Sequence, residues 1–483
     1  MLFLKHLVLL SLLVNSSGIF ALELDKFDLP DLGDSAGTLI SPIEEKQLGE
    51  AFFRSLHAQI EINQDSEVQQ YIQTIGEKLV AHSDMPSYPF HFFVVMENNI
   101  NAFAGPGGYI GVNSGLILMT EAESELASVI AHEIAHVTQR HLYRSYEASS
   151  RLSIPMMAAT LGAILLGSQS PAAGQAAIMA IQAGSVQFQI NFTREHEEEA
   201  DRVGMQTLSA STYDPRAMPT FFERLQQSSR YSGQNVPEFL RTHPVTASRI
   251  SDSRGRADNY SYRQYPDSLA YQLIKTKLQV LLAGENDNLR GILQAKLTQG
   301  LSEQRTVAKY GLGLLALKTQ NFVEAEAIFQ ALNKEFPDQA HYAAGLARTA
   351  LDSNNFTLAL NRYQKLNLQF PDNNSIRLEY VGALLKSGDA KTAKTILLTL
   401  PPKIQKLPLY FEKLAQIYGD LNQPAESHRY LADYYFAMGD TQQAILQIRL
   451  AQQIRGISSQ MEAILRDKLT FLLMTQKQEM QNR

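Results

Sequence analysis

The sequence of 483 residues predicts a mainly α-helical protein in which an α+β domain is followed by an all-α solenoid of helical repeats. Two observations predict this division. Segments with the alternating hydrophobicity of β-strands lie within residues 89–119, whereas a 34-residue period begins beyond residue 300. The composition, with 45% hydrophobic and 19% charged residues, excludes wholesale disorder. At about 100–200 residues per domain, the length predicts two to four domains.

Composition also removes several classes of function. The net charge is −6 and no block of five or six Lys or Arg occurs, which argues against a nucleic-acid-binding protein. The chain contains no cysteine, so disulfides, thiolate zinc sites, cysteine nucleophiles and a lipid-bearing amino-terminal cysteine are all excluded. The chemistry must therefore come from His, Asp, Glu, Ser, Tyr and backbone groups.

The first 21 residues have the pattern of a cleavable signal peptide. Lys5 and His6 precede the apolar run Leu7–Val14, and small or polar residues lead to a cleavage site near Ala21. The run is too short to span about 30 Å of hydrocarbon, and the alternative is a buried first helix. We expect an exported protein, located in a periplasm or outside the cell, with at most peripheral membrane contact.

The next segments have distinct patterns. Residues 22–40 are rich in Asp, Gly and Pro and predict an extended lead-in, whereas residues 43–82 have helical spacing of apolar residues. Residues 89–96 and 101–119 alternate like strands, with a turn at 105–108.

A polar, irregular segment at residues 251–266 marks the expected domain boundary. We therefore expect a first domain over residues 41–252, a linker over 253–267 and a repeat domain over 268–483.

The repeat domain has a period of 34 residues that resembles the tetratricopeptide repeat. Small residues at fixed positions would let two antiparallel helices approach closely, and an aromatic residue four positions later would pack against the next unit. The recurring positions are Gly313, Ala347 and Val381; Ala325, Ala359 and Ala393; Phe329, Tyr363 and Leu397; and Pro337 and Pro371. An undifferentiated helical bundle is the alternative, and the common register argues against it.

Residues 126–141 contain the HExxH pattern. On a helix, His132 and His136 lie one turn apart and about 40° apart around the axis, so both imidazoles can reach one metal ion. Glu133 is adjacent to the pair, in position to accept a proton from the attacking water. At about 100° per residue around the helix, His141 lies on the same side as the core residues. We therefore expect it to pack or to form a local hydrogen bond.

A catalytic zinc ion takes three protein ligands, and residues 191–208 are the obvious source of the third. Drawn as a helix, they place Glu197 and Asp201 on the apolar face, and two buried acids there call for a cation. His196 lies at the edge of that face and is a rival ligand. The apolar residues of the face are Ala200, Val203, Gly204 and Leu208.

The HEIAH motif, followed about sixty residues later by EEEAD, resembles the zinc metallopeptidase family of the CAAX prenyl endopeptidases and HtpX-type proteases. NAFAGPGGYIGVNSGLI is similar to the strand pair that precedes the HExxH helix in that family. The resemblance implies a zincin-like metalloprotease domain that holds one Zn²⁺ per chain through His132, His136 and Glu197. It also implies that Asp201 supports these ligands by orienting a ligand histidine, and that Glu133 is the catalytic base.

The whole chain is similar to a family of periplasmic proteases of Gram-negative bacteria that act in outer-membrane protein assembly. This resemblance implies quality control of unfolded or misassembled outer-membrane β-barrel proteins, with the repeats binding the substrate or the β-barrel assembly machinery. The alternative is a chaperone or adaptor that acts through the repeats, with proteolysis secondary or latent. For the protease, we expect an extended substrate to pair with the strand around residues 108–114, unless that strand is covered.

Two segments of the first domain leave alternatives open. Residues 152–185 are uncharged and rich in Ala, Gly and Met, and they predict a buried helical hairpin, a mobile lid over the active site or a membrane-surface element. His243 precedes Pro244 and is either a turn residue or, by the resemblance, a residue of the active-site cleft. In the cleft it would stabilise the oxyanion or occupy the fourth position on zinc.

Overall fold

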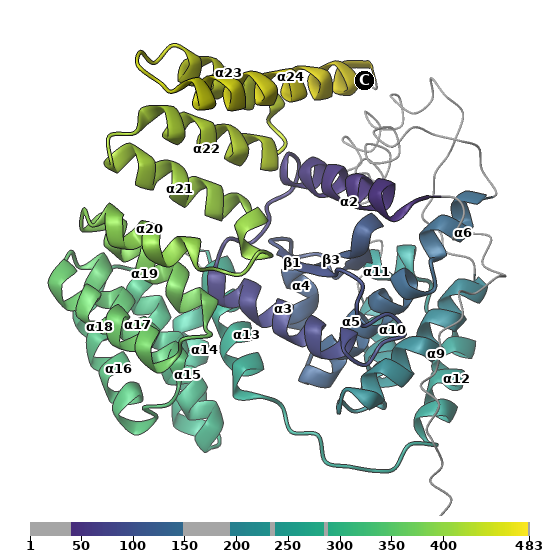
Figure 1. Ribbon diagram of the computed structural model, residues 1–483. Coiled ribbons are helices and arrows are strands. Elements are labelled where there is room, and N and C mark those ends of the chain that lie inside the picture. The colour runs from purple at the N-terminus through teal and green to yellow at the C-terminus, as the bar shows by residue number, and fades with distance from the viewer. Residues whose placement is uncertain (1–39, 148–193, 232–236, 285–287, 482–483) are drawn as a thin grey trace, which may run out of the picture. The chain divides into compact units, whose positions relative to one another are not determined.

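The computed structural model describes residues 40–147, 194–231, 237–284 and 288–481 (Figure 1). The expected signal peptide, the lead-in up to residue 39 and the segment 152–185 lie outside the described residues. None of the helices in the described part combines the length and the apolar character needed to cross a bilayer.

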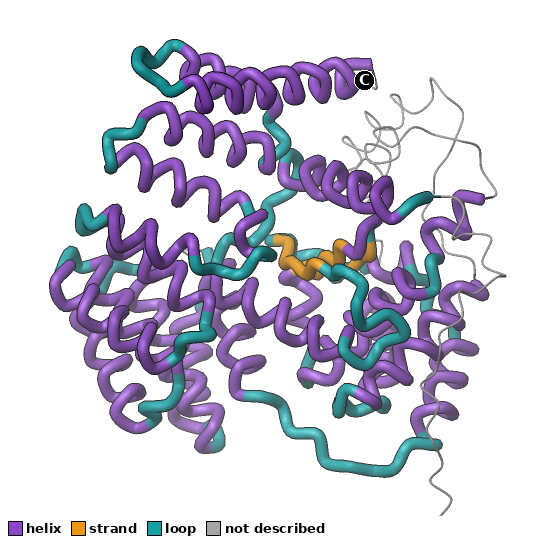
Figure 2. Tube along the Cα trace, viewed as in Figure 1, coloured by secondary structure: helices purple, strands orange, loops and turns teal. Residues whose placement is uncertain are grey.

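A small three-stranded sheet lies among the helices of the first domain (Figure 2). Strand β3 (Tyr109–Asn113) is central: it pairs in parallel with β1 (His91–Val95) and antiparallel with β2 (Ala102–Ala104). A turn of 3₁₀ helix, η2 (Pro106–Gly108), returns the chain from β2 to β3. The left-handed φ of 68° at Gly107 and 75° at Gly108 is accessible to glycine at little cost.

Of the two alternatives for the strand around residues 108–114, pairing with a substrate or a covered strand, this topology supports the covered strand. Both edges of β3 already carry a strand, because β1 and β2 occupy its two sides. The turn at 105–108 folds β2 back onto Ile110–Val112, which takes the edge that a substrate would have used.

Helices surround this sheet and bury a shared apolar core. Helix α3 packs on β1, and α5 contacts α3, α9, α10 and β2. Ser41 begins the first described helix with a capping box, and Asp65 caps the next by accepting hydrogen bonds from the backbone N–H of Glu67 and Val68. The helices are α2 (Pro42–His57), α3 (Ser66–Val80), α4 (Ser114–Met119), α5 (Glu123–Thr138), α6 (His141–Glu147), α9 (Arg194–Ala210), α10 (Ala217–Tyr231), α11 (Glu238–Thr242) and α12 (Ala247–Ala257).

Two local expectations are wrong. The strand expected over residues 101–119 ends at Asn113, and helix α4 follows at once. The segment expected to be irregular from residue 251 is helical as far as Ala257. Thr246 caps that helix by accepting from the Arg249 N–H, and Ile250 and Ala257 are buried at helical spacing, so a sparse apolar face suffices to hold a polar helix.

Helical pairs follow, and each helix from α15 to α24 packs against the next along the chain. The residue between the two helices of a pair adopts a left-handed conformation at 34-residue intervals: Gln320, Asn354, Gly388, Asn422 and Gly456. The repeat register therefore extends to the last pair. The helices are α13 (Leu269–Leu282), α14 (Leu289–Gln299), α15 (Ser302–Lys318), α16 (Phe322–Glu335), α17 (Ala340–Asp352), α18 (Phe356–Gln369), α19 (Asn374–Lys386), α20 (Ala390–Leu398), α21 (Pro408–Asp420), α22 (Pro424–Ala437), α23 (Thr441–Gln452) and α24 (Ser459–Gln481).

The recurring residues of the sequence pattern form the repeat core. The small residues Ala325, Ala359 and Ala393 are buried, as are Phe329 and Tyr363 four positions later. A Cβ added to Gly313 would lie 2.9 Å from the Phe329 ring, so only a small residue fits there.

Helices of the repeat domain also contact the first domain. Helices α13 and α19 pack on α3, and α22 packs on α2. The Ser375 backbone N–H donates to Gln70 Oε1 over 2.8 Å, and the hydroxyls of Ser66 and Ser375 are 2.7 Å apart. The Arg54 guanidinium lies over the Phe436 ring at 4.0 Å. In the absence of any disulfide, these noncovalent contacts join the two domains.

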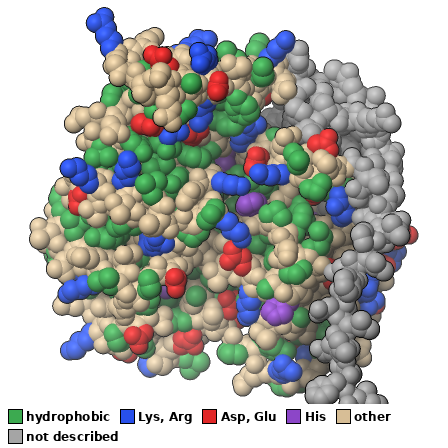
Figure 3. Space-filling model, viewed as in Figure 1, with side chains coloured by type: hydrophobic (Ala, Val, Ile, Leu, Met, Phe, Trp, Pro, Cys, Tyr) green, Lys and Arg blue, Asp and Glu red, His purple; other side chains and the backbone are tan. Residues whose placement is uncertain are grey.

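The molecular face in Figure 3 shows hydrophobic side chains over helices α20 to α22, among interspersed charges of both signs. Exposed large apolar residues on or beside these helices include Leu398 and Leu407. This mixture fits a surface for protein partners better than one for nucleic acid.

Gly439 provides a test of the contact between the domains. Its φ is 79°, and an added Cβ would lie 2.6 Å from the Arg54 carbonyl oxygen of α2. We expect Gly439→Ala to lower the free energy of the first urea-induced unfolding transition by about 2–4 kcal/mol, combining left-handed strain and overpacking. Gly456→Ala is the matched control, because its φ is 80° and an added Cβ meets nothing within 4 Å. Equal losses in the two variants would contradict the described contact.

Candidate metal centre

Helix α5 carries the HExxH motif at the centre of the first domain. His132, Glu133 and His136 are all buried, and Leu126 and Ile130 face the hydrophobic core from another side of the helix. The Nε2 atoms of His132 and His136 lie 3.0 Å apart, so both imidazoles face the same point. The helical spacing alone predicts this convergence.

Helix α9 brings Glu197 to the same point. Its carboxylate oxygens lie 3.4 Å from His132 Nε2 and 3.5 Å from His136 Nε2. A Cβ added to Gly204 would lie 3.0 Å from the His132 backbone nitrogen, so the absence of a side chain there lets α9 approach α5 closely.

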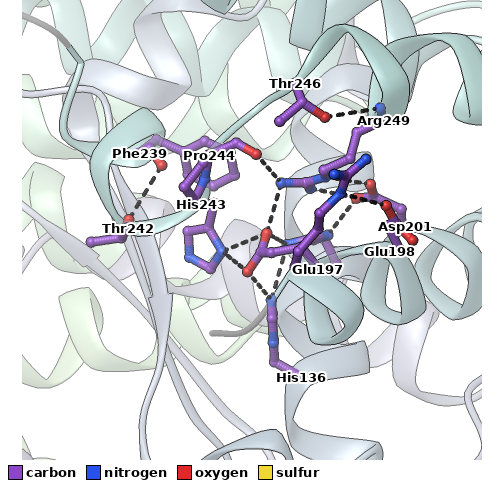
Figure 4. A network of polar contacts seen from close by, with 12 residues as sticks. His136, Glu197, Glu198, Asp201, Phe239, Thr242, His243, Pro244, Thr246 and Arg249 are labelled. Carbon is purple, nitrogen blue, oxygen red and sulfur yellow. Dashed lines mark hydrogen bonds and ion pairs between the residues drawn. The ribbon is translucent and has the colours of Figure 1, made fainter. Parts of the chain in front are cut away.

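His243 completes the cluster from the carboxyl end of α11 (Figure 4). Its Nδ1 lies 3.0 Å from Glu197 Oε1, and its Nε2 lies 3.6 Å from Glu133 Oε1. The His243 ring stacks on Phe239 with the ring centroids 4.7 Å apart. The sequence leaves His243 as either a turn residue or a residue of the active-site cleft; the structure buries it beside the other three residues of this cluster.

Together, His132, His136, Glu197 and His243 each offer one nitrogen or oxygen atom within 4.8 Å of the others. All four are buried. A set of nitrogen and carboxylate donors without thiolate is typical of a catalytic zinc site. His196, the rival ligand, is not in this group; its ring instead stacks on that of His141 with centroids 4.4 Å apart.

Asp201 and Arg249 contact residues of the cluster on the side away from the converging donor atoms. Asp201 Oδ1 lies 3.0 Å from His132 Nδ1, which is the ring atom that faces away from the cluster. Arg249 donates from Nε and Nη2 to the two oxygens of Asp201, each over 2.7 Å, and its Nη1 lies 2.8 Å from Glu197 Oε2. The same Nη1 donates to the Pro244 carbonyl over 2.9 Å, which ties the His243 segment to α9.

The sequence does not predict that Arg249 contacts the two acids of α9. It is 1% exposed, which is exceptional for an arginine unless its charge is compensated. The signal in the sequence is the pair of acids on the buried face of 191–208, because a buried acid that is not in the donor group still needs a cation beside it.

Burial and neighbouring charges shift the pKa values of the cluster. Burial would lower the pKa of His132, but its contacts with Asp201 and Glu197 outweigh burial and raise that pKa to about 9. Burial would raise the pKa of Glu197, but the neighbouring imidazoles hold it well below its usual range. Burial lowers the pKa of His136 well below its usual range. The cluster thus combines an ionised carboxylate with a neutral imidazole, which suits a bound cation.

Glu133 is buried beside these residues but is chemically distinct from them. Its carboxylate accepts no hydrogen bond from another described side chain, although it is fully buried. Burial raises the pKa of this carboxyl group, which makes it a stronger base once it is ionised. A buried carboxylate that lies beside a set of metal donors and accepts no side-chain hydrogen bond can accept a proton from an attacking water.

Comparisons with known proteins agree with this geometry. The model of peptidase family M48 matches residues 66–257, and a tetratricopeptide-repeat model matches residues 350–417. The beta-barrel assembly-enhancing protease of Escherichia coli strain K12 is 35% identical over 417 residues, which are 86% of this chain and 85% of that protein.

Two further relatives are similar to this chain over shorter lengths. A putative beta-barrel assembly-enhancing protease of Vibrio cholerae is 41% identical over 320 residues, which are 66% of each chain. The mitochondrial metalloendopeptidase OMA1 of Schizosaccharomyces pombe is 29% identical over 180 residues, covering 37% of this chain and 50% of that protein.

Proposed function

Because the chain belongs to peptidase family M48, we propose that it is an exported, zinc-dependent endopeptidase that acts on misassembled outer-membrane β-barrel proteins in the periplasm. The observation that carries the activity is the buried cluster of His132, His136 and Glu197, with the buried carboxylate of Glu133 beside it. The substrate class comes from the relatives named beta-barrel assembly-enhancing protease.

In this proposal His132, His136 and Glu197 hold one Zn²⁺ per chain, and their donor atoms support that choice of metal. The ion supplies Lewis-acid polarisation of the scissile carbonyl and activation of a water molecule. Glu133 accepts the proton of the attacking water and passes it to the leaving amine. Asp201 fixes the ring of His132 through Nδ1, and Arg249 holds both acids of α9 in place.

We propose that His243 takes the fourth donor position and that the described arrangement is a latent state. The support is its membership of the four-residue donor group and its 3.0 Å contact with Glu197. Cleavage then requires His243 to withdraw. His243→Ala is expected to raise the basal peptidase activity if His243 blocks the site, whereas a loss would assign it to stabilisation of the oxyanion.

We propose that an extended substrate pairs with strand β2. Strand β2 (Ala102–Ala104) is an edge of the described sheet, and it contacts helix α5. The backbone of Ala104 lies against the carboxylate of Glu133. A peptide added to this edge would therefore have its backbone beside the catalytic base.

The repeat domain provides the surface for substrates or for the β-barrel assembly machinery. Its support is the matched tetratricopeptide model and the apolar face over α20 to α22. A second candidate function, assistance of β-barrel assembly through the repeats with proteolysis latent, is favoured by the burial of the cluster and by the position of His243 in it.

The direct test is cleavage of a purified, urea-unfolded β-barrel outer-membrane protein by the full mature chain. We expect zinc-dependent cleavage that 1,10-phenanthroline abolishes and zinc restores. A soluble unfolded protein of similar size is the control for substrate class. Equal cleavage of both would contradict the proposed substrate, and failure of zinc to support any cleavage of either would contradict the proposed enzyme.

A further inference from the structure

His136 and His132 differ in the group that contacts Nδ1, the ring nitrogen that faces away from the donor cluster. For His132, that atom faces the carboxylate of Asp201. For His136, Nδ1 lies 2.8 Å from Nδ1 of another histidine, His141, while Nε2 faces the donor cluster. Carboxylates, backbone carbonyls and water are the usual partners of a metal-binding imidazole, so a second imidazole in this position calls for an explanation.

The chain makes a tight turn to bring His141 there. Helix α5 ends at Thr138, and Arg140 adopts a left-handed φ of 54° before α6 begins at His141. A bulky residue enters this conformation only where the surroundings compensate for the strain. His141 is completely buried, and His196 of α9 stacks on it with an angle of 17° between the rings.

A carboxylate fixes the other side of His141. Its Nε2 lies 3.1 Å from Glu199 Oε2, and Arg144 Nη1 donates to that same oxygen over 2.8 Å. Glu199 follows Glu197 by two residues on α9, so one helix supplies both a donor to the cluster and the acceptor for His141.

The polarity of these hydrogen bonds determines the proton positions. An ionised carboxylate only accepts, so Nε2 of His141 carries a proton that it donates to Glu199. The Nδ1 of the neutral His141 ring is then an acceptor, and the Nδ1 of His136 must carry the proton between the two rings. The Nε2 of His136 then carries no proton, and its lone pair is directed at the cluster.

We propose that His141 is a positioning residue that, fixed by Glu199, holds His136 in the tautomer and orientation that metal binding needs. The inference rests on the proposed metal site. In this proposal the Glu199 carboxylate fixes the His141 ring, and the His141 ring in turn fixes the ring of His136.

The test is zinc affinity, measured by chelator competition on the full mature chain. His141→Phe keeps an aromatic ring for His196 but removes the acceptor, and we expect its zinc affinity to fall about 10–100-fold. His141→Asn places an amide oxygen where Nδ1 was, and we expect it to restore most of the affinity. Zinc-loaded His141→Phe should lose activity in kcat with KM little changed, because substrate binding does not involve His141.

A second pair of variants covers the case in which His141→Phe does not fold. Glu199→Ala leaves His141 free to adopt the other tautomer and should weaken zinc binding several-fold. Glu198→Ala is its matched control, since Glu198 lies one residue away and pairs only with exposed Arg194 among the described contacts. Thermal unfolding of the metal-free variants reports any general loss of stability.

The outcomes separate this inference from the proposed function. Wild-type zinc affinity in His141→Phe, equal losses in His141→Asn and His141→Phe, or equal effects of the two glutamate variants would overturn the positioning role alone. A wild-type chain that binds no zinc would instead overturn the proposed metal site.

Discussion

Glu133→Gln should lower the peptidase kcat by about 10²–10⁴-fold while leaving the zinc content unchanged. The amide has nearly the shape of the carboxylate but cannot accept the proton of the attacking water. Glu133 also lies outside the four-residue donor group, so its replacement removes no metal donor. Turnover of an unfolded substrate, measured together with metal content, checks both parts of this prediction.

The matched control is Glu195→Gln, which changes an exposed acid of α9 with the same loss of charge. It should leave kcat unchanged. A Glu133→Gln variant that retains more than about a tenth of wild-type kcat would contradict the role of Glu133 as the base, as would a comparable loss in the control.

The same variant separates the two candidate functions. If Glu133→Gln still assists the assembly of a β-barrel protein, the repeats act without proteolysis and both functions belong to this chain. If assistance is lost together with cleavage, the adaptor function fails.

Lys277→Ala should produce the largest loss of stability, about 3–5 kcal/mol in the first unfolding transition. Lys277 on α13 is buried, and its Nζ lies 2.6 Å from both Asp65 Oδ2 and Glu67 Oε2 at the start of α3. Its removal leaves two carboxylates without their cation at the junction of the domains. Burial also raises the pKa of nearby Glu379 to about 7, so this site already tolerates negative charge poorly.

The stability lost in Lys277→Ala should become smaller as the pH falls. Burial would raise the pKa of Asp65, but the charge and hydrogen bond of Lys277 outweigh burial and lower it. A lowered carboxyl pKa contributes stability above the unfolded-state pKa, and this stability disappears as the pH falls through the folded-state value. The difference between wild type and Lys277→Ala should therefore shrink as the pH falls below about 4.

Lys309→Ala is the control for this prediction, because Lys309 and Glu335 form an exposed pair 3.9 Å apart. It should cost less than about 1 kcal/mol. Urea unfolding of the full chain, followed by circular dichroism, measures both variants. A Lys277→Ala loss no larger than that of the control would contradict the described junction.

The sequence was most informative where local periodicity and structure coincide. A 34-residue register predicts the repeat helices, because each unit buries the same small and aromatic positions, such as Ala359 and Tyr363. The i, i+4 spacing predicts that His132 and His136 converge, because both lie on one uninterrupted helix. The expected α+β metallopeptidase domain followed by repeats is confirmed by the family matches.

The remaining parts of the site depend on long-range contacts. A helix continued through His141 places it on the core side, but helix α5 ends at Thr138, and the left-handed Arg140 brings the His141 ring back against His136. The sequence predicts that His141 packs or forms a local hydrogen bond; in the structure its ring nitrogens lie beside His136 and beside Glu199, which is 58 residues away. Arg249 reaches the acids of α9 only through the fold of α12, and no local pattern links residues 48 positions apart.

The measurement that most directly tests the central claim is the zinc content of the purified mature chain, obtained by native mass spectrometry and elemental analysis. We predict one zinc ion per chain, loss of the ion in Glu197→Ala, and its retention in Glu133→Gln. A folded wild-type chain that holds no zinc, even after dialysis against zinc and removal of the excess, would contradict the claim that this cluster is the metal centre of a peptidase.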